Sequence, residues 1–244
     1  MHPILLKLGP VTLYSYGFMM ALAFLMCYYL LHREYRKRGE KPDFASNIVF
    51  WAAIGGIVGA KLFYILEFPS NFFINPLGMI FTGSGLVFHG GVIGGAVAVI
   101  IYLNRSQKPI LANGDIIIPI MFIGQAIGRI GCFLVQDHIG KVSSLPWAIF
   151  YDGALRHPIA LYHILLGLGL FIILYKLKDK YFDGFLTILF MLVYGIVRFF
   201  LDFLRVEPLY YGLTNGQYLS IILVIISVIL LIKRFKSNKK FSKI

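Results

Sequence analysis

The feature that most constrains this chain is a series of seven apolar stretches, each close to the length of a membrane span. They cover roughly 11–31, 45–68, 86–104, 110–134, 159–175, 184–203 and 217–232. Seven transmembrane helices need roughly 140 residues, close to the 59% of the 244 residues that are hydrophobic. Only 14% are charged, which excludes an ordinary soluble enzyme, a disordered protein and a disulfide-stapled secreted scaffold. The sequence predicts an all-α polytopic membrane protein with a single domain, residues 1–244.

Two segments are less regular than the others. The fourth stretch is interrupted by Asp115, Gln125 and Arg129, so it is the least certain as a simple span. Residues 69–85 are semi-apolar and contain proline and glycine. This composition favours an interfacial or re-entrant piece over another crossing.

The basic residues predict the orientation. Of the 23 lysines and arginines, 16 lie in alternate connections between the spans and in the C-terminal tail, residues 233–244. Four lie on the opposite side. The positive-inside rule then places the C-terminus in the cytoplasm and the N-terminus outside the cytoplasm. The net charge of +12 is explained by this topology and by attraction to anionic lipid. Nucleic-acid binding is not expected, because no basic soluble region is present to do it.

A charged residue at membrane depth costs about 2.5–3.5 kcal/mol on the insertion scale, so it is a functional candidate. Arg198 and Asp202 are four residues apart, which places them on one helix face where they can pair. Arg205 follows on nearly the same face. Two arginines and one aspartate give the stripe a net positive charge, which suits a phosphate. The alternative is a structural ion pair in the sixth helix.

Arg129 and His89 are two further polar candidates, and glycines surround both. The functional interpretation places Arg129 at the outer mouth of a cavity, opposite Arg198. The alternative is a snorkelling arginine in a closely packed helix. An imidazole can take a proton near neutral pH, but His89 can equally be a hydrogen-bonded packing residue. The GxxxG pairs Gly90–Gly94 and Gly91–Gly95 predict close helix packing.

Tyrosines and cysteines add little by themselves. Tyr16 and Tyr194 are polar groups at similar depth, but tyrosines are common at membrane interfaces. Cys27 and Cys132 have neither metal-binding spacing nor a reason to form a disulfide. The residues together predict a cavity lined by two arginines and a histidine and open to the extracytoplasmic side. Such a cavity should accept an anionic amphiphile, and phospholipid is the simplest one present there.

Seven motifs along nearly the whole chain resemble, in the same order, those of the bacterial prolipoprotein diacylglyceryl transferase family: YSYGFMMALAF (14–24), GAKLFYILE (59–67), GSGLVFHGGVIGG (83–95), GRIGCFLVQDHIG (128–140), RHPIALYH (156–163), YGIVRFFLDFLR (194–205) and GQYLS (216–220). That family transfers the diacylglyceryl group of phosphatidylglycerol to the lipobox cysteine of a prolipoprotein, forms a thioether and releases glycerol phosphate. The resemblance implies an enzyme of the bacterial cell membrane whose active site faces the extracytoplasmic side. It implies no metal or organic cofactor.

The resemblance also implies roles for individual residues. Arg129 and Arg198 would hold the phosphate and stabilise the charge of the departing group. His89 is the candidate for activating the thiol, since a thiolate is the competent nucleophile, and Tyr194 is a further catalytic candidate. The remaining candidates for binding phosphatidylglycerol are Tyr16, Lys61, Asp137, Gly140, Asp202 and Arg205.

The chain departs from the family pattern at four positions. Cys132 and Val135 replace two asparagines, Asp137 replaces a glutamate, and Lys61 stands where arginine is usual. Cys132 is a weak hydrogen-bonding group and Val135 offers none; a reactive role for Cys132 is disfavoured by its apolar setting. Two alternatives stay open, namely a paralogue with the same donor and another acceptor, and a non-catalytic lipid-binding protein or transporter. A transporter should show repeated halves, and no repeat is present.

Overall fold

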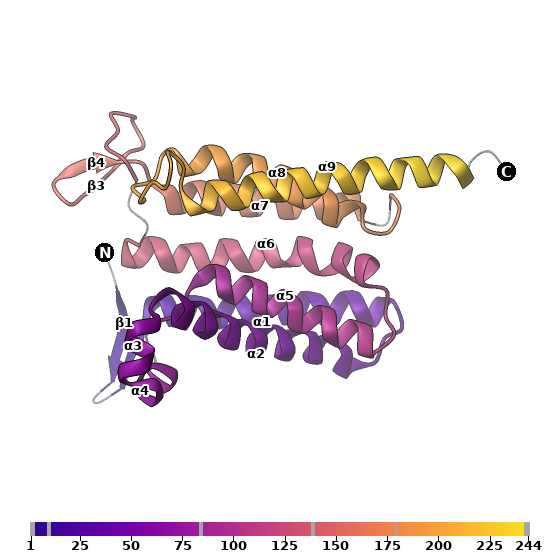
Figure 1. Ribbon diagram of the computed structural model, residues 1–244, viewed down its shortest axis with the longest axis horizontal. Coiled ribbons are helices and arrows are strands. Elements are labelled where there is room, and N and C mark those ends of the chain that lie inside the picture. The colour runs from indigo at the N-terminus through magenta and orange to yellow at the C-terminus, as the bar shows by residue number, and fades with distance from the viewer. Residues whose placement is uncertain (1–2, 9–10, 83–84, 138–139, 179, 242–244) are drawn as a thin grey trace. The chain divides into compact units, whose positions relative to one another are not determined.

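The computed structural model contains seven helices, within the residues that it describes, that are long and apolar enough to cross a membrane. They are α1 (Ser15–Lys37), α2 (Pro42–Glu67), α5 (Phe88–Arg105), α6 (Ile110–Val135), α7 (Ile159–Leu177), α8 (Phe185–Asp202) and α9 (Asn215–Phe241) (Figure 1). The described residues exclude 1–2, 9–10, 83–84, 138–139, 179 and 242–244, so two residues in each of the motifs at 83–95 and 128–140 lie outside them. The predicted seven-helix membrane fold is confirmed.

Two β-hairpins were not predicted. Strand β1 (Ile4–Leu8) pairs antiparallel with β2 (Val11–Tyr14), so the first helix begins four residues later than the apolar stretch indicated. Val11 and Thr12 are β-branched and favour a strand. Strand β3 (Ile149–Tyr151) pairs with β4 (Ala154–Arg156) through an Asp-Gly turn with positive φ at both residues, the signature of a tight hairpin.

The least certain span, α6, is one continuous helix that contains Pro119. Its polar residues are tolerated because α6 has the largest buried share of the seven candidate spans. The Asp115 carboxylate accepts hydrogen bonds from the backbone N–H of Gly184 at 2.7 Å and of Thr187 at 2.8 Å. It also accepts one from Thr187 Oγ1 at 2.7 Å. Asp115 therefore caps the start of α8, where backbone donors have no partner within the helix.

The chain divides into two compact units, Tyr28–Asn113 and the combination of Met1–Cys27 with Gly114–Ile244. In the unit Tyr28–Asn113, α2 and α5 lie against each other at glycines. A Cβ added to Gly59 would lie 2.3 Å from the Gly90 oxygen, and one added to Gly94 would lie 2.3 Å from the Gly55 oxygen. This confirms that the Gly90–Gly94 pair serves close packing. Whether the whole chain acts as one domain stays a prediction.

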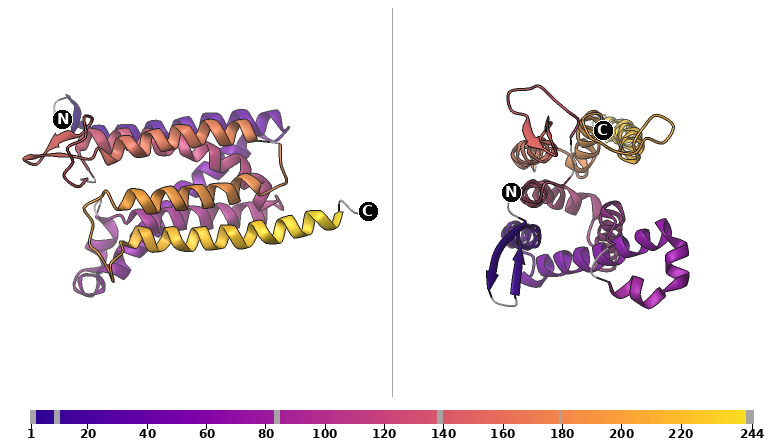
Figure 2. Two further views of the ribbon diagram at one scale, coloured as in Figure 1. Left: turned by 90° about the horizontal axis from the view of Figure 1, so that it is seen from above. Right: turned by 90° about the vertical axis from the view of Figure 1, so that its left-hand side faces the viewer.

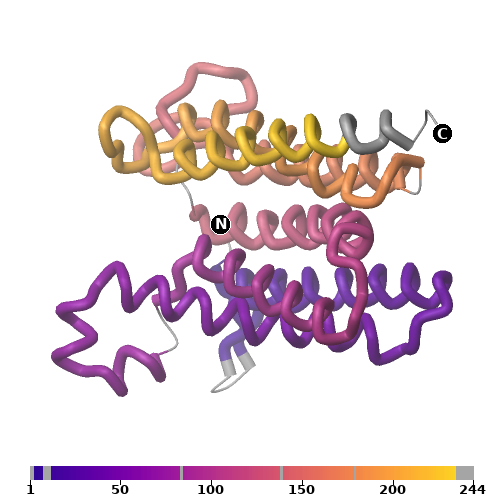
Figure 3. Tube along the Cα trace, turned by 45° about the vertical axis from the view of Figure 1, so that its right-hand side comes forward, coloured from indigo at the N-terminus to yellow at the C-terminus, as the bar shows by residue number. Residues whose placement is uncertain are grey.

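The same unit carries two short helices between α2 and α5, α3 (Pro69–Ile74) and α4 (Pro76–Phe81). Figure 3 shows this part of the chain as a bent extension beside the long helices. Each helix has six residues and begins at a proline, whose fixed φ suits the first helical position. Neither is long enough to cross a membrane, as predicted for residues 69–85. Phe73 and Ile74 are each 81% exposed, which fits the expected place at the membrane interface.

In the other unit, α6, α7 and α8 pack around a core that includes Phe122, Leu170, Leu174 and Leu186, and α9 packs against α8. The hairpin β3–β4 and the connection between α8 and α9 lie at the same end of this unit (Figures 1 and 2). The Lys141 N–H donates to the Leu204 oxygen at 2.8 Å, which joins the two segments. Segments that the charge pattern assigns to one side of the membrane therefore meet in space.

Candidate functional site

A buried ion-pair cluster lies at the end of α8. Arg198 Nη2 is 3.2 Å from Asp202 Oδ1, as the four-residue spacing predicts, and Arg205 Nη1 is 3.4 Å from the same oxygen. The other carboxylate oxygen, Oδ2, accepts a hydrogen bond from Thr214 Oγ1 at 3.1 Å. Asp202 is only 3% exposed. A buried charge needs partners of this kind to offset its lost hydration.

The expected net positive charge of this stripe is wrong. Arg205 Nη2 also forms an ion pair with Glu207, which lies beyond α8 in the connection to α9. Two guanidinium groups are therefore matched by two carboxylates. The sequence interpretation counted only Asp202, because Glu207 falls outside the helical stripe.

The start of α9 is tied to the cluster by a reciprocal cap. The Thr214 N–H donates to Gln217 Oε1 at 2.9 Å, and the Gln217 N–H donates to Thr214 Oγ1 at 3.1 Å. This is a capping box, and the Thr-x-x-Gln spacing was a sequence signal that could have identified it. A Cβ on Gly216 would lie 2.1 Å from Asp202 Oδ2. Only glycine allows α9 to begin this close to the carboxylate.

Arg129, on α6, differs from the paired arginines. Its side chain is buried, with 8% of the residue exposed, and its Nη1 has no hydrogen-bond partner. The Cys132 thiol lies close enough to interact with the guanidinium. The charges of Arg129 and Arg198 are also close enough to interact. A buried cationic nitrogen without a partner is costly, so this position favours an anionic ligand.

His163 is a site residue that sequence reasoning missed. It lies on α7, is 0% exposed, and its Nε2 is 3.0 Å from Arg198 Nη1. An arginine can only donate, so the imidazole nitrogen must accept and the ring is neutral in this contact. His163 is the last residue of the motif 156–163, but a lone histidine in an apolar helix does not indicate which residue it contacts.

The two tyrosines lie near the arginines. The Tyr194 ring packs against Phe190 with centroids 5.4 Å apart, and its hydroxyl is close enough to Arg198 to interact electrostatically. Tyr16 is 42% exposed and interacts electrostatically with Arg129 and Asp137. The tyrosines are therefore polar groups beside the arginines, not only interfacial anchors.

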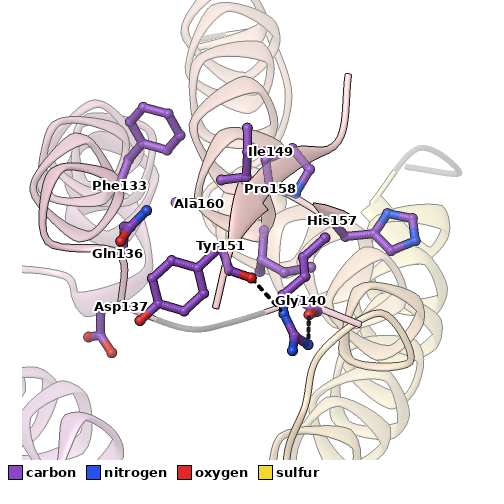
Figure 4. A pocket seen from close by; sticks show the side chains of 11 residues that line it. Phe133, Gln136, Asp137, Gly140, Ile149, Tyr151, His157, Pro158 and Ala160 are labelled. Carbon is purple, nitrogen blue, oxygen red and sulfur yellow. Dashed lines mark hydrogen bonds between the residues drawn. The ribbon is translucent and has the colours of Figure 1, made fainter. Parts of the chain in front are cut away.

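A small pocket lies beyond the end of α6 (Figure 4). Its accessible volume is about 30 Å³, enough for roughly two water molecules. Its polar lining comes from Gln136, Asp137, Gly140, Tyr151, Arg156 and His157. Arg156 donates to the backbone oxygens of Tyr151 at 3.2 Å and Gly140 at 3.4 Å. A Cβ on Gly140 would lie 2.2 Å from the His157 oxygen, so packing alone explains this glycine.

His89 and Lys61 belong to the unit Tyr28–Asn113. Lys61 Nζ donates to the Thr82 backbone oxygen at 2.8 Å. The half-buried His89 ring meets the Phe88 ring nearly edge-on, with centroids 5.8 Å apart. The other eight predicted site residues lie in the second unit. A cavity shared by His89 and the arginines stays a prediction.

Within the described part of the chain, no group of three or more His, Cys, Asp or Glu residues is arranged to hold a metal ion. Cys27 and Cys132 are free thiols, and Cys27 donates to the Ile120 oxygen at 3.5 Å. The unit that combines Met1–Cys27 with Gly114–Ile244 holds buried arginines with neutral and anionic partners. Such groups suit the binding of a phosphate.

Comparison with known proteins gives one consistent result. Residues 3–233 match the family described as prolipoprotein diacylglyceryl transferase. A protein named phosphatidylglycerol–prolipoprotein diacylglyceryl transferase from Clostridium tetani (strain Massachusetts / E88) is 32% identical over 98% of this chain and 100% of its own length. Proteins of the same name from Idiomarina loihiensis and Coxiella burnetii (strain RSA 331 / Henzerling II) are 33% and 35% identical, over 93% and 92% of this chain and 91% and 92% of theirs. The chain belongs to the prolipoprotein diacylglyceryl transferase family.

Proposed function

We propose that this chain transfers the diacylglyceryl group of phosphatidylglycerol to the lipobox cysteine of prolipoproteins at the bacterial cell membrane. Family membership supports the reaction. The structural observation that carries the proposal is the buried Arg129 guanidinium, whose Nη1 has no partner, with the charge of Arg198 within reach. The phosphate of phosphatidylglycerol is an anion that reaches such a membrane site directly from the bilayer.

In the proposed reaction the lipobox sulfur attacks the glyceryl carbon that carries the phosphate. A C–S bond forms as the C–O bond breaks, and the oxygen leaves with the electron pair as glycerol phosphate. Arg129 and Arg198 stabilise the negative charge that grows on the leaving group, and this stabilisation is larger in the transition state than in the bound lipid. A base removes the thiol proton, and His89 is the proposed base.

The other candidates have supporting roles in this proposal. Tyr16, Tyr194 and Asp137 contact the head group near the arginines. Asp202 and Arg205 position Arg198. Lys61 binds phosphatidylglycerol from the unit Tyr28–Asn113. Gly140 keeps the segment after α6 close to His157. The active site faces the extracytoplasmic side, where the few basic residues of the outer connections lie.

Purified protein in nanodiscs that contain phosphatidylglycerol, mixed with a lipobox peptide, tests the proposal. Mass spectrometry should detect the thioether-linked diacylglyceryl peptide, and a Cys→Ser peptide should give none. Arg129→Ala and Arg198→Ala should each lower kcat/KM by about 100-fold or more. Arg105→Ala, at the basic end of α5, is the matched control and should leave kcat/KM unchanged.

Each alternative predicts a different result in the same assay. The paralogue with another acceptor predicts phosphatidylglycerol consumption only when a different thiol or amine is supplied. A non-catalytic lipid-binding protein predicts lipid binding and no product with any acceptor. Absence of product while a related transferase is active in the same nanodiscs would overturn the proposed function.

A further inference from the structure

The contact between Arg198 and His163 has a direction that arginine chemistry imposes. Arg198 Nη1 and His163 Nε2 are 3.0 Å apart. The guanidinium is always charged and has only donors. His163 Nε2 must therefore present its lone pair, and the proton of the neutral ring must be on Nδ1. The contact exists only while the imidazole is uncharged.

Arg198 is held from two sides by groups on two helices. Asp202, on α8 itself, binds Nη2 at 3.2 Å, and His163, on α7, binds Nη1. Two acceptors on two terminal nitrogens fix the plane of the guanidinium, which a single contact would leave free to rotate. Because the imidazole is neutral, it orients the arginine without cancelling its charge.

Burial makes this orientation firm. His163 is 0% exposed, and the Arg198 side chain is 11% exposed, so water does not compete freely for either group. One turn further along α7, a Cβ on Gly167 would lie 3.0 Å from the Phe122 oxygen and 3.2 Å from Ala126 Cβ. The helix that carries His163 is therefore tightly packed against α6, and the ring has little freedom to move away.

The charges near this contact are mostly cationic. From α8 they are Arg198 itself, Asp202 and the weak acid Tyr194; Arg129 comes from α6, and Arg205 follows α8. His157, just before α7, and Tyr162, in its first turn, are hydrogen-bonded to each other at 3.1 Å. Asp202 is the one carboxylate in this set, and its oxygens already serve Arg198, Arg205 and Thr214. A proton on His163 would place a second cation against Arg198 and remove the acceptor.

We propose that His163 is a positioning residue for the transferase site, whose neutral imidazole aims Arg198 at the phosphate of the donor lipid. This inference rests on the proposed function, because it assigns the phosphate to Arg198. It adds a residue from α7 that contacts no substrate and acts through the arginine.

Two substitutions separate positioning from packing. His163→Leu fills the space with an apolar side chain of similar size and removes the acceptor. His163→Gln keeps an acceptor oxygen that does not titrate. His32→Leu, a change of the same kind in the C-terminal part of α1 and in the other unit, is the matched control and should leave activity unchanged. The nanodisc assay gives kcat/KM for phosphatidylglycerol at pH 7.5, and native mass spectrometry gives lipid affinity without turnover.

His163→Leu should lower kcat/KM at pH 7.5 by about 10- to 100-fold, the value of a hydrogen bond to a charged group, and should weaken lipid binding. His163→Gln should recover most of both.

Two outcomes would overturn the inference: a Leu variant as active as wild type, or equal losses in the Leu and Gln variants. Wild-type activity distinguishes this failure from failure of the proposed function. If wild type makes no product, the proposed function fails. The affinities of the two variants for phosphatidylglycerol then decide alone whether His163 orients Arg198 toward a phosphate.

Discussion

Asp202 organises the arginines at the end of α8 at the scale of single atoms. Its Oδ1 lies 3.2 Å from Arg198 and 3.4 Å from Arg205, and its Oδ2 accepts from Thr214. Both oxygens are engaged by neighbouring residues of the chain, and the residue is buried. In the proposed site, Asp202 would act on a bound phosphate through Arg198, and the position of its carboxylate depends on where α9 begins.

A methyl group at Gly216 should disturb this arrangement. The Cβ of Gly216→Ala would lie 2.1 Å from Asp202 Oδ2 and 3.2 Å from Arg198 Nη2, so the carboxylate must move and Arg198 with it. We expect kcat/KM to fall by about tenfold or more, equivalent to roughly 1.4 kcal/mol. Gly169→Ala on α7 is the control, because nothing lies within 4 Å of its added Cβ. Equal rates for the two variants in the transferase assay would show that Asp202 does not position Arg198.

Helix ends also decide which polar residues a span can carry. Asp115 lies on α6, but its carboxylate oxygens accept hydrogen bonds from backbone N–H groups at the start of α8. The carboxylate is thus placed at the positive end of a helix dipole, which is the favourable arrangement. This explains an acidic residue in a membrane span without assigning it to catalysis.

Removal of that cap should weaken the fold and leave the chemistry in place. Asp115→Ala deprives Gly184, Thr187 N–H and Thr187 Oγ1 of their acceptor. We expect the free energy of unfolding to fall by about 1–2 kcal/mol, measured as a lower Tm in detergent. Asp183→Ala changes an exposed aspartate in the adjacent connection and should leave Tm unchanged. The idea fails if both variants melt with the wild type.

The α2–α5 pair depends on glycine in a position-specific way. Gly94→Ala would place Cβ 2.3 Å from the Gly55 oxygen, whereas Gly56→Ala would place it 3.5 Å from the Gly91 oxygen. Backbone cannot yield as a side chain does, so the first change must push the helices apart. We expect Gly94→Ala to cost about 1–3 kcal/mol of stability and Gly56→Ala to cost little. A comparison of Tm values tests this, and similar losses at both sites would contradict glycine-specific packing.

Elements and site residues were predictable to different degrees. Span positions follow from hydropathy because each span must be apolar along nearly its whole length, and the Arg198–Asp202 pair follows from helix periodicity. The β3–β4 hairpin has three residues in each strand, too few to give a pattern. The contact of His163 with Arg198 joins residues 35 apart in sequence. It depends on how α7 and α8 are rotated about their axes, which local sequence does not determine.

For the molecule as a whole, the sidedness of its loops has a consequence beyond orientation. In the unit that holds the arginines, the segment 140–158 and the connection between α8 and α9 meet at one end. This end carries few basic residues, while the connection after α7 carries Lys176, Lys178 and Lys180. If the positive-inside rule governs insertion, Arg198, Asp202 and Arg205 must open toward the extracytoplasmic side, where the lipobox cysteine of an exported protein arrives.

Cysteine labelling of intact spheroplasts tests this orientation. Ser144→Cys and Asp183→Cys place exposed thiols in the two sets of connections of the same unit. A membrane-impermeant maleimide should label Ser144→Cys in intact cells, and Asp183→Cys only after the membrane is broken, because the basic connections are retained in the cytoplasm. Gln107→Cys, in the connection between α5 and α6, should behave like Asp183→Cys and extends the test to the other unit. The unmodified chain, whose Cys27 and Cys132 lie within α1 and α6, sets the background. Labelling of Asp183→Cys in intact cells would invert the topology and place the arginines on the side where the proposed acceptor does not emerge.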